Sequence, residues 1–191
     1  MAIIDRVKGM LLAPRAEWPR VAAEPATVQS VYTGWILILG LIGPIAVLLL
    51  MGLFATGFGI STAIATYVNT LVGVAIVALI ADLIAPTFGG TRDYLAALKL
   101  VAYSATAVWI AQIGLIVPIL GVFIVLAGAI YSVYLLFLGA PVLNKCSGDK
   151  AVAYTIVLLL CAIVIGYIMS RILFGMLGMP GGVGAPRLGG F

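Results

Sequence analysis

The feature that most constrains this chain is a series of apolar stretches, each as long as a helix that crosses a bilayer. A transmembrane helix needs about 20 consecutive apolar residues. Only 8% of the residues are charged, whereas a soluble domain carries about 25%. The apolar excess must face lipid or other apolar surfaces, so the sequence predicts an all-α membrane helix bundle. We predict five transmembrane helices, over residues 31–55, 63–85, 94–116, 119–140 and 151–177.

The third and fourth spans come from one stretch that allows two interpretations. Residues 94–140 form a nearly unbroken apolar run of 47 residues. A four-span alternative treats this run as a single helix, but that helix would be about twice the length of one span. We therefore expect two helices that turn back at Pro118, which Gly114 and Gly121 flank. In the first span, Pro44 predicts a kink.

Two terminal segments flank the predicted five-helix domain, residues 29–177. The tail, residues 178–191, is rich in Gly and Pro and is expected to be disordered. Residues 1–28 are predicted to form a cytoplasmic amphipathic arm that lies on the membrane, because apolar residues recur there at helical spacing with charged residues between them. Three prolines, Pro14, Pro19 and Pro25, are expected to break regular helix in this arm. Trp18 is expected to act as an interfacial anchor. The residues predicted to meet the membrane surface are Arg6, Lys8, Arg15, Trp18 and Arg20.

The distribution of basic residues predicts the orientation of the bundle. In the five-span arrangement, the segments on one side hold eight of the ten basic residues, and the other side holds Arg171 and Arg187. An excess of Lys and Arg is typical of cytoplasmic segments, so we expect the N-terminus inside and the C-terminus outside. The basic residues form no dense cluster with interleaved aromatic residues, so the expected partner is the lipid bilayer and not a nucleic acid.

Few ionisable side chains lie within the predicted spans. Asp82 and Lys99 flank the hairpin between the second and third spans at similar depth, so an intramembrane ion pair is expected. In a structural interpretation the pair holds the hairpin near the cytoplasmic interface; in a functional one it belongs to a proton or ion path. Asn69 and Gln112 are expected to hydrogen-bond between helices. Small residues at helix-packing spacing are Gly128 and Ser132, and Gly166 and Ser170.

The residues that usually carry catalysis or bind metals are scarce. The sequence has no histidine, which is the side chain most often used as a general base. Its two cysteines, Cys146 and Cys161, have no metal-ligand spacing. We therefore expect no catalytic residue, no metal site and no cofactor, and we interpret the chain as non-enzymatic.

Several short motifs occur in a definite order along the chain. The arm carries Pro14, Trp18 and Glu24. The segment that opens the third span carries Gly89-Gly90 and then Tyr103-Ser104, and the fourth span carries Tyr131 and, near its end, Gly139. This order resembles bacterial members of the Yip family, whose eukaryotic relatives interact with Ypt/Rab GTPases. The resemblance covers about residues 5–175, and it implies a membrane scaffold in a bacterial cytoplasmic (inner) membrane. The family pattern expects a proline where this chain has Ala107, so a straighter third helix is expected.

Three functions remain open on the sequence. The first is a scaffold or organiser that binds other membrane proteins or lipids, with a membrane-protein partner or a second copy of the chain as its partner. The second is a transporter or channel for a small solute or ion that uses Asp82 and Lys99. The third, an enzyme that acts on lipid, would need an interfacial pocket built from Asp82, Arg92, Asp93 and Tyr94.

Overall fold

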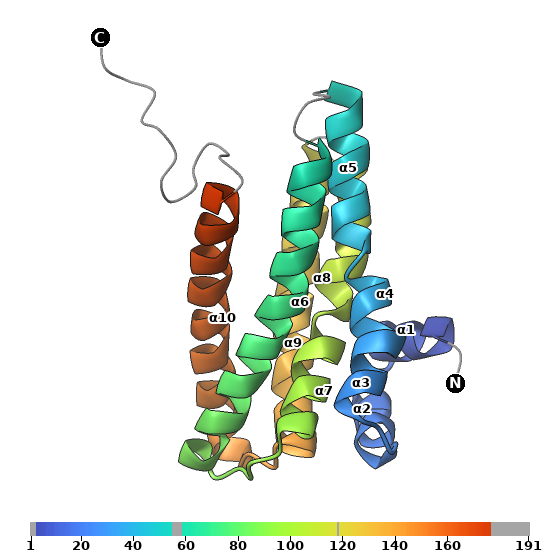
Figure 1. Cartoon of the computed structure of the whole chain (residues 1–191). Coiled ribbons are helices and arrows are strands. Elements are labelled where there is room, and N and C mark those ends of the chain that lie inside the picture. Colours follow the sequence, from blue (N-terminus) through green and yellow to red (C-terminus); the bar gives the residue numbers. More distant parts are fainter. Residues whose placement is uncertain (1–2, 55–58, 118, 177–191) are drawn as a thin grey trace.

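The protein is a bundle of helices, seen here in a computed structural model that describes residues 3–54, 59–117 and 119–176 (Figure 1). Every regular element in these ranges is a helix. Five segments are long and apolar enough to cross a membrane, so the prediction of an all-α bundle with five transmembrane helices is confirmed. These segments are Val28–Leu50, Gly59–Phe88, Tyr94–Ile116, Leu120–Leu143 and Gly148–Gly175.

Several spans consist of more than one helical element. The first contains α3 (Val28–Val31), the π-helix η1 (Tyr32–Ile36), α4 (Leu37–Leu39) and α5 (Ile42–Phe54). The second is α6 (Gly59–Ile84) followed by the 3-10 helix η2 (Ala85–Phe88). The third is α7 (Tyr94–Ser104), α8 (Thr106–Ala111) and the 3-10 helix η3 (Gln112–Ile116). The last two spans are the single helices α9 (Leu120–Leu143) and α10 (Gly148–Met176).

The first span is interrupted close to its proline, as expected. The α-helix stops at Leu39 and resumes at Ile42. Pro44 lies in the first turn of α5, and its ring would clash with the carbonyl four residues earlier, at Gly40. The break therefore falls one turn before the proline that causes it.

The third span is also interrupted, at Ala105, so the expectation of a straighter helix is wrong. Near Ala105, two side-chain hydroxyl groups form hydrogen bonds with backbone groups of the third span. The Thr106 hydroxyl donates to the Tyr103 carbonyl at 2.7 Å, and the Ser132 hydroxyl of α9 accepts from the Val108 N–H at 3.0 Å. Side chains of this type compete with the helical ladder and bend it without any proline.

The turn between the third and fourth spans falls where the sequence predicts it. The 3-10 helix η3 ends at Ile116 and α9 begins at Leu120, and Pro118 lies outside the described residues. A Cβ on Gly121 would collide with the Gly114 carbonyl, so the two glycines allow the helices to approach closely as they reverse. The tail predicted to be disordered, residues 178–191, also lies outside the described residues.

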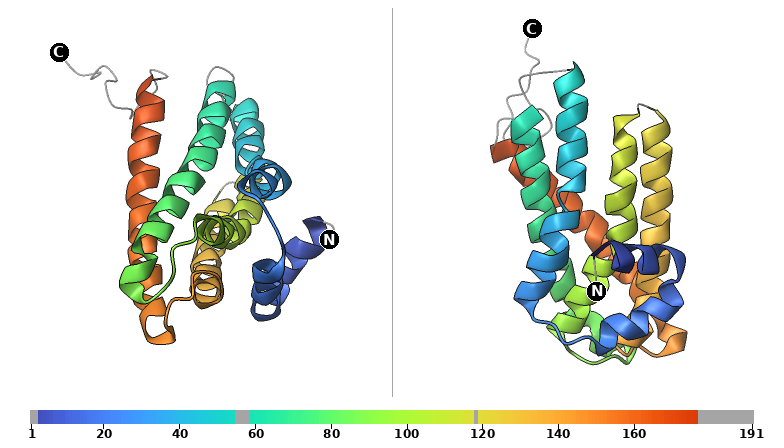
Figure 2. Two further views of the ribbon diagram at one scale, coloured as in Figure 1. Left: turned by 60° about the horizontal axis from the view of Figure 1, so that its bottom comes forward. Right: turned by 90° about the vertical axis from the view of Figure 1, so that its right-hand side faces the viewer.

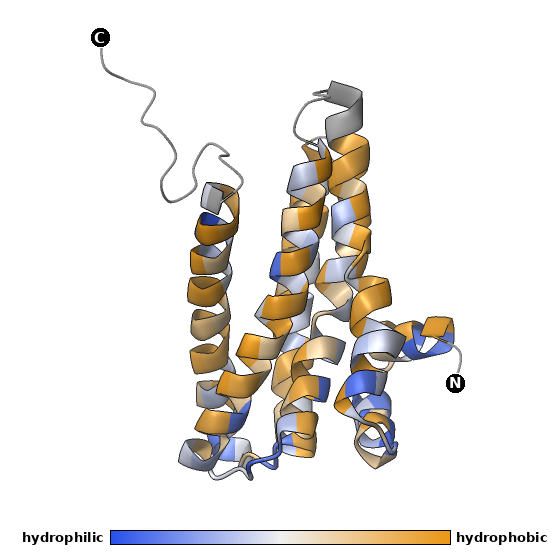
Figure 3. Ribbon diagram, in the orientation of Figure 1, coloured by the Kyte–Doolittle hydropathy of each residue, from blue (hydrophilic) through white to orange (hydrophobic). Residues whose placement is uncertain are grey.

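The third span is the centre of the bundle, and the last two spans form its periphery. About 56% of the third span is buried within the protein, compared with 17% for α9 and 17% for α10. The view in Figure 2 shows α7 enclosed by its neighbours and α10 at the edge. Hydrophilic residues gather at the end of the bundle where the arm lies (Figure 3). The outer helices therefore expose long apolar faces.

The arm folds as two helices, α1 (Ile3–Leu12) and α2 (Pro14–Ala23), that pack against the bundle (Figure 2). Trp18 is 1% exposed, and its ring lies against Gly139 of α9. The expectation that Trp18 anchors the arm in the membrane interface is therefore wrong, because the indole contacts protein and not lipid. Arg6 is likewise buried and does not meet the membrane surface. The remaining basic residues of the predicted surface arm, Lys8, Arg15 and Arg20, are exposed.

We predict that Gly139→Val releases α2 from α9. A Cβ at this position would lie 2.7 Å from the Trp18 ring and 2.6 Å from a methyl of Leu100. Overpacking of this kind lowers the free energy of unfolding by about 1–3 kcal/mol. Thermal unfolding followed by circular dichroism measures the loss. Gly73→Val is the matched control, because Gly73 is also helical but no described atom lies within 4 Å of the position that a Cβ would take there. Equal stability of the two variants would contradict the prediction.

Candidate functional site

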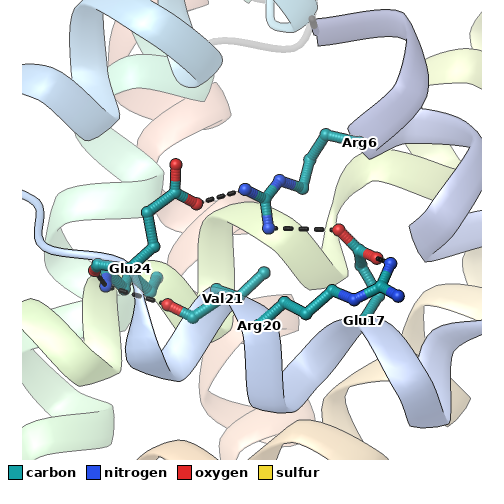
Figure 4. A network of polar contacts seen from close by, with 6 residues as sticks. Arg6, Glu17, Arg20, Val21 and Glu24 are labelled. Atoms are coloured by element: carbon teal, nitrogen blue, oxygen red, sulfur yellow. Dashed lines mark hydrogen bonds and ion pairs between the residues drawn. The ribbon is translucent and has the colours of Figure 1, made fainter. Parts of the chain in front are cut away.

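The two arm helices are joined to each other by a buried network of charged side chains. The Arg6 guanidinium forms ion pairs with Glu17, at 3.1 Å, and with Glu24 (Figure 4). Glu17 also pairs with the exposed Arg20 at 3.2 Å. The Arg6 and Glu17 side chains are only 8% and 3% exposed. Two buried charges of opposite sign stabilise each other inside the protein, and removal of either one leaves the other with only its more exposed second partner, Arg20 for Glu17 and Glu24 for Arg6.

Lys99 of α7 holds the end of the second arm helix. Its ammonium donates to the Val21 carbonyl at 3.0 Å and to the Glu24 carbonyl at 2.6 Å. These carbonyls lie at the C-terminal end of α2, where helical carbonyls have no partner within the helix. A cation at this end also interacts favourably with the helix dipole. Lys99 therefore acts as a C-terminal cap for α2, supplied by a different helix.

The predicted ion pair between Asp82 and Lys99 does not form. In the described ranges the ion pairs join Arg6, Glu17, Glu24 and Arg20, and none includes Asp82 or Lys99. The prediction rests on similar depth in the bundle, but depth does not decide which face of a helix a side chain occupies. Lys99 lies on the face of α7 that α2 covers, and the carbonyls of α2 take its hydrogen bonds.

A cavity of about 260 Å³ lies beside this network. Its walls come from α1, from the start of the first span and from α7, and they include Arg6, Glu24 and Lys99. Trp35, on the π-helix η1, also lines the cavity. The Trp35 ring stacks on Tyr103 with centroids 4.5 Å apart. Its indole N–H is buried without a hydrogen-bond partner among the described residues. A second cavity of about 370 Å³ lies on the other side of Lys99 and is lined by Asp93 and Lys145.

Sequence reasoning missed Glu17 and Trp35 as members of this site. Pro14 is a signal that could have pointed to Glu17, although the sequence alone predicts a helix breaker at this proline. Proline is favoured at the first position of a helix, where its missing N–H needs no partner, and Pro14 is indeed the first residue of α2. A helix that starts at Pro14 places Glu17 and Val21 on one face, four residues apart. No comparable signal marks Trp35.

A comparison with models of known protein families gives a match that covers most of the chain. The model of the Yip1 domain matches residues 8–169, from α1 to near the end of α10. The chain belongs to the Yip1 domain family. No curated protein and no solved structure matches the chain at a significant level.

In this Yip1 domain, most of the motif residues lie where the arm meets the bundle. Pro14 begins α2, Glu24 pairs with Arg6, and Trp18 packs on Gly139. The Tyr131 hydroxyl of α9 donates to the Leu11 carbonyl of α1 at 2.8 Å. The other four lie elsewhere. Tyr103 packs on the Trp35 ring, and Ser104 lines an apolar cavity of about 230 Å³. Gly89 ends η2 in a left-handed conformation, and Gly90 packs against the Asn144 carbonyl.

The two pairs of small residues have different surroundings in the Yip1 domain. Gly128 packs on Ala107 and Ala111 of the third span, and Ser132 is hydrogen-bonded to the same span. Gly166 has no described atom within 4 Å of where a Cβ would be. Its neighbour one turn along, Ser170, accepts a hydrogen bond from the Asn69 amide of α6 at 3.3 Å. That contact confirms the expectation that Asn69 hydrogen-bonds between helices.

We predict that Arg6→Met loosens the arm of the Yip1 domain. The change leaves the buried Glu17 carboxylate with only the exposed Arg20 as an ion-pair partner among the described residues. Breaking a buried pair costs about 3–5 kcal/mol, and the remaining contact with Arg20 offsets part of that cost. Faster tryptic cleavage after Arg15 and Arg20, together with a lower thermal midpoint, measures the effect. Arg15→Met removes an exposed charge and is the control for thermal stability. Arg6→Met with Glu17→Leu should recover part of the loss, and no recovery would contradict the role of the pair.

Proposed function

We propose that this protein is a non-enzymatic membrane scaffold that binds a transmembrane helix of another membrane protein. The binding surface is a cleft between α6, the third span and α10. The observation that carries the proposal is that this cleft, about 390 Å³ in volume, is lined by two glycines with open space above them, Gly73 and Gly166. Glycines on a membrane-facing surface allow another helix backbone to approach closely.

An unpartnered polar atom in the cleft supports a helix as the occupant. The Asn69 amide N–H group binds Ser170, but its carbonyl oxygen is buried and accepts no hydrogen bond within the described part of the chain. Asn69 lines the cleft together with Thr70. Polar side chains of this kind hydrogen-bond across helix pairs in membranes. An acyl chain offers no donor, whereas a Ser, Thr or Gln side chain of a partner helix does.

The arrangement of charges favours a scaffold over a transporter. The transporter hypothesis requires Asp82 and Lys99 as neighbours on a polar path. Lys99 is instead engaged with the carbonyls of α2, and Arg6 and Glu17 serve the same arm. The buried charges thus hold the arm in place, and none of them lines the cleft.

We also propose that the protein lies in a bacterial cytoplasmic membrane with its N-terminus inside. The arm, the loop after η2 and the loop before α10 lie at the same end of the bundle (Figure 1). These segments and the first turns of α7 and α10 hold eight basic residues, and the opposite end of α10 holds Arg171. Such an imbalance supports a cytoplasmic position for the first end.

A reporter fused after residue 191 tests this orientation. We predict that alkaline phosphatase is active and green fluorescent protein is dark at the C-terminus, because both depend on the compartment they reach. The same two reporters at the N-terminus should give the opposite result. A fluorescent C-terminal fusion would overturn the proposed orientation.

The scaffold proposal predicts that Gly166→Leu removes the partner. A Cβ at Gly166 meets open space among the described residues, so we expect the leucine side chain to enter the cleft, the protein to fold, and most of the partner that co-purifies in mild detergent to be lost. Quantitative mass spectrometry of the purified material measures the loss. Ala127→Leu is the control, because Ala127 is exposed on α9 and lines none of the cavities described above. A wild-type protein that purifies as a lone monomer would contradict the proposal.

A further inference from the structure

The cavity beside the arm is lined by hydrogen-bond donors from three separate elements. Arg6 comes from α1, Trp35 from η1 and Lys99 from α7. The cavity has a volume of about 260 Å³. Several donors around one space are what a bound oxyanion requires, and the donors in its lining distinguish this cavity from the apolar clefts between the transmembrane helices.

Two of these donors have hydrogen-bonding capacity that the described part of the chain does not use. The ammonium of Lys99 has three N–H groups, of which two donate to the Val21 and Glu24 carbonyls. Lys99 is only 6% exposed. The Trp35 indole N–H has no partner there, and Trp35 is 3% exposed. A buried donor left without a partner is unfavourable, so a ligand that accepts a hydrogen bond from it recovers that loss.

The balance of charge in the cavity favours an anion. Among the described residues of its lining, Arg6 and Lys99 are cationic, and Glu24 is the one carboxylate. Glu24 is already paired with Arg6. The hydrogen bonds of Lys99 go to neutral backbone carbonyls, so its charge has no carboxylate in direct contact. An anion in the cavity would provide the opposite charge.

The backbone that carries Trp35 is itself unusual. Residues Tyr32–Ile36 form a π-helix, in which the Leu37 N–H bonds to the Tyr32 carbonyl. Such segments are rare and are frequent at functional sites, because the extra residue redirects a side chain. Here the π-helix places the Trp35 ring against Tyr103 and in the lining of the cavity.

We propose that this cavity binds a phosphate group, carried either by an anionic phospholipid headgroup or by a soluble phosphate compound. Lys99 and Trp35 donate to the phosphate oxygens, and Arg6 adds positive charge from the side of α1. Three directions of approach fit a tetrahedral oxyanion better than a planar carboxylate, which presents two oxygens in one plane. The inference does not depend on the scaffold proposal, because the cleft that would hold a partner helix lies elsewhere in the bundle.

The test uses the full chain, purified in a non-ionic detergent. Native mass spectrometry measures the affinity for phosphatidylglycerol and for phosphatidylcholine, and a thermal-shift assay compares inorganic phosphate with chloride at equal ionic strength. Retention of phosphatidylglycerol alone identifies a lipid headgroup as the ligand. Stabilisation by inorganic phosphate alone identifies a soluble phosphate compound. If neither probe binds more tightly than its reference, the proposal is overturned.

Two variants locate the site. Trp35→Phe keeps an aromatic ring on Tyr103 but removes the N–H, and it should weaken binding by about three- to tenfold. Lys99→Met should weaken binding further. Because this change also removes the hydrogen bonds that hold α2, a loss of binding could follow from release of α2, and the result for Trp35→Phe then decides whether the cavity binds phosphate. Lys145→Met is the matched control, since Lys145 lines the neighbouring cavity. Unchanged binding by Trp35→Phe would overturn the proposal, as would a loss caused by Lys145→Met instead.

Discussion

The structure depends on one interaction more than on any other, the hydrogen bonds from the Lys99 ammonium to the carbonyls at the end of α2. A lysine buried at 6% exposure is unfavourable unless its donors are satisfied. The C-terminal end of a helix supplies unpaired carbonyls and a partial negative charge at the same place. Lys99 and α2 therefore stabilise each other, and each would be unfavourable in its position without the other.

The rest of the arm follows from this contact. Once α2 is held over α7, Trp18 can pack on Gly139, and Arg6 of α1 can reach both Glu17 and Glu24. The Tyr131 hydroxyl then joins α9 to α1. Residues of the arm, the third span and the fourth span thus form one interlocked unit at a single end of the bundle. Most of the residues that carry the family resemblance gather in this unit, where they make packing contacts between the arm and the bundle.

The bundle has two hollows that differ in polarity, a polar cavity beside the arm and a largely apolar cleft beside α10. At the arm end, ion pairs and hydrogen bonds join several helices, and a cavity lined by unused donors remains. The helix α10 stands at the edge of the bundle (Figure 1), and the cleft beside it is lined largely by apolar residues and includes the glycines Gly73 and Gly166. A polar cavity beside the arm and a largely apolar cleft beside α10 are compatible with two separate binding surfaces, one for a phosphate group and one for a helix.

The amino-acid sequence by itself determined the class of fold, the number of spans and the turn near Pro118. Each follows from properties that act along the chain: apolar length against bilayer thickness, and proline against the helical ladder. It could not decide that Lys99 binds α2 instead of Asp82, that Trp18 is buried, or that Trp35 faces a cavity. Those outcomes depend on which helix faces touch, and the contacts join residues as far apart as 75 and 78 positions. Only the tertiary structure decides them, because a buried side chain takes the partner that packing brings to it.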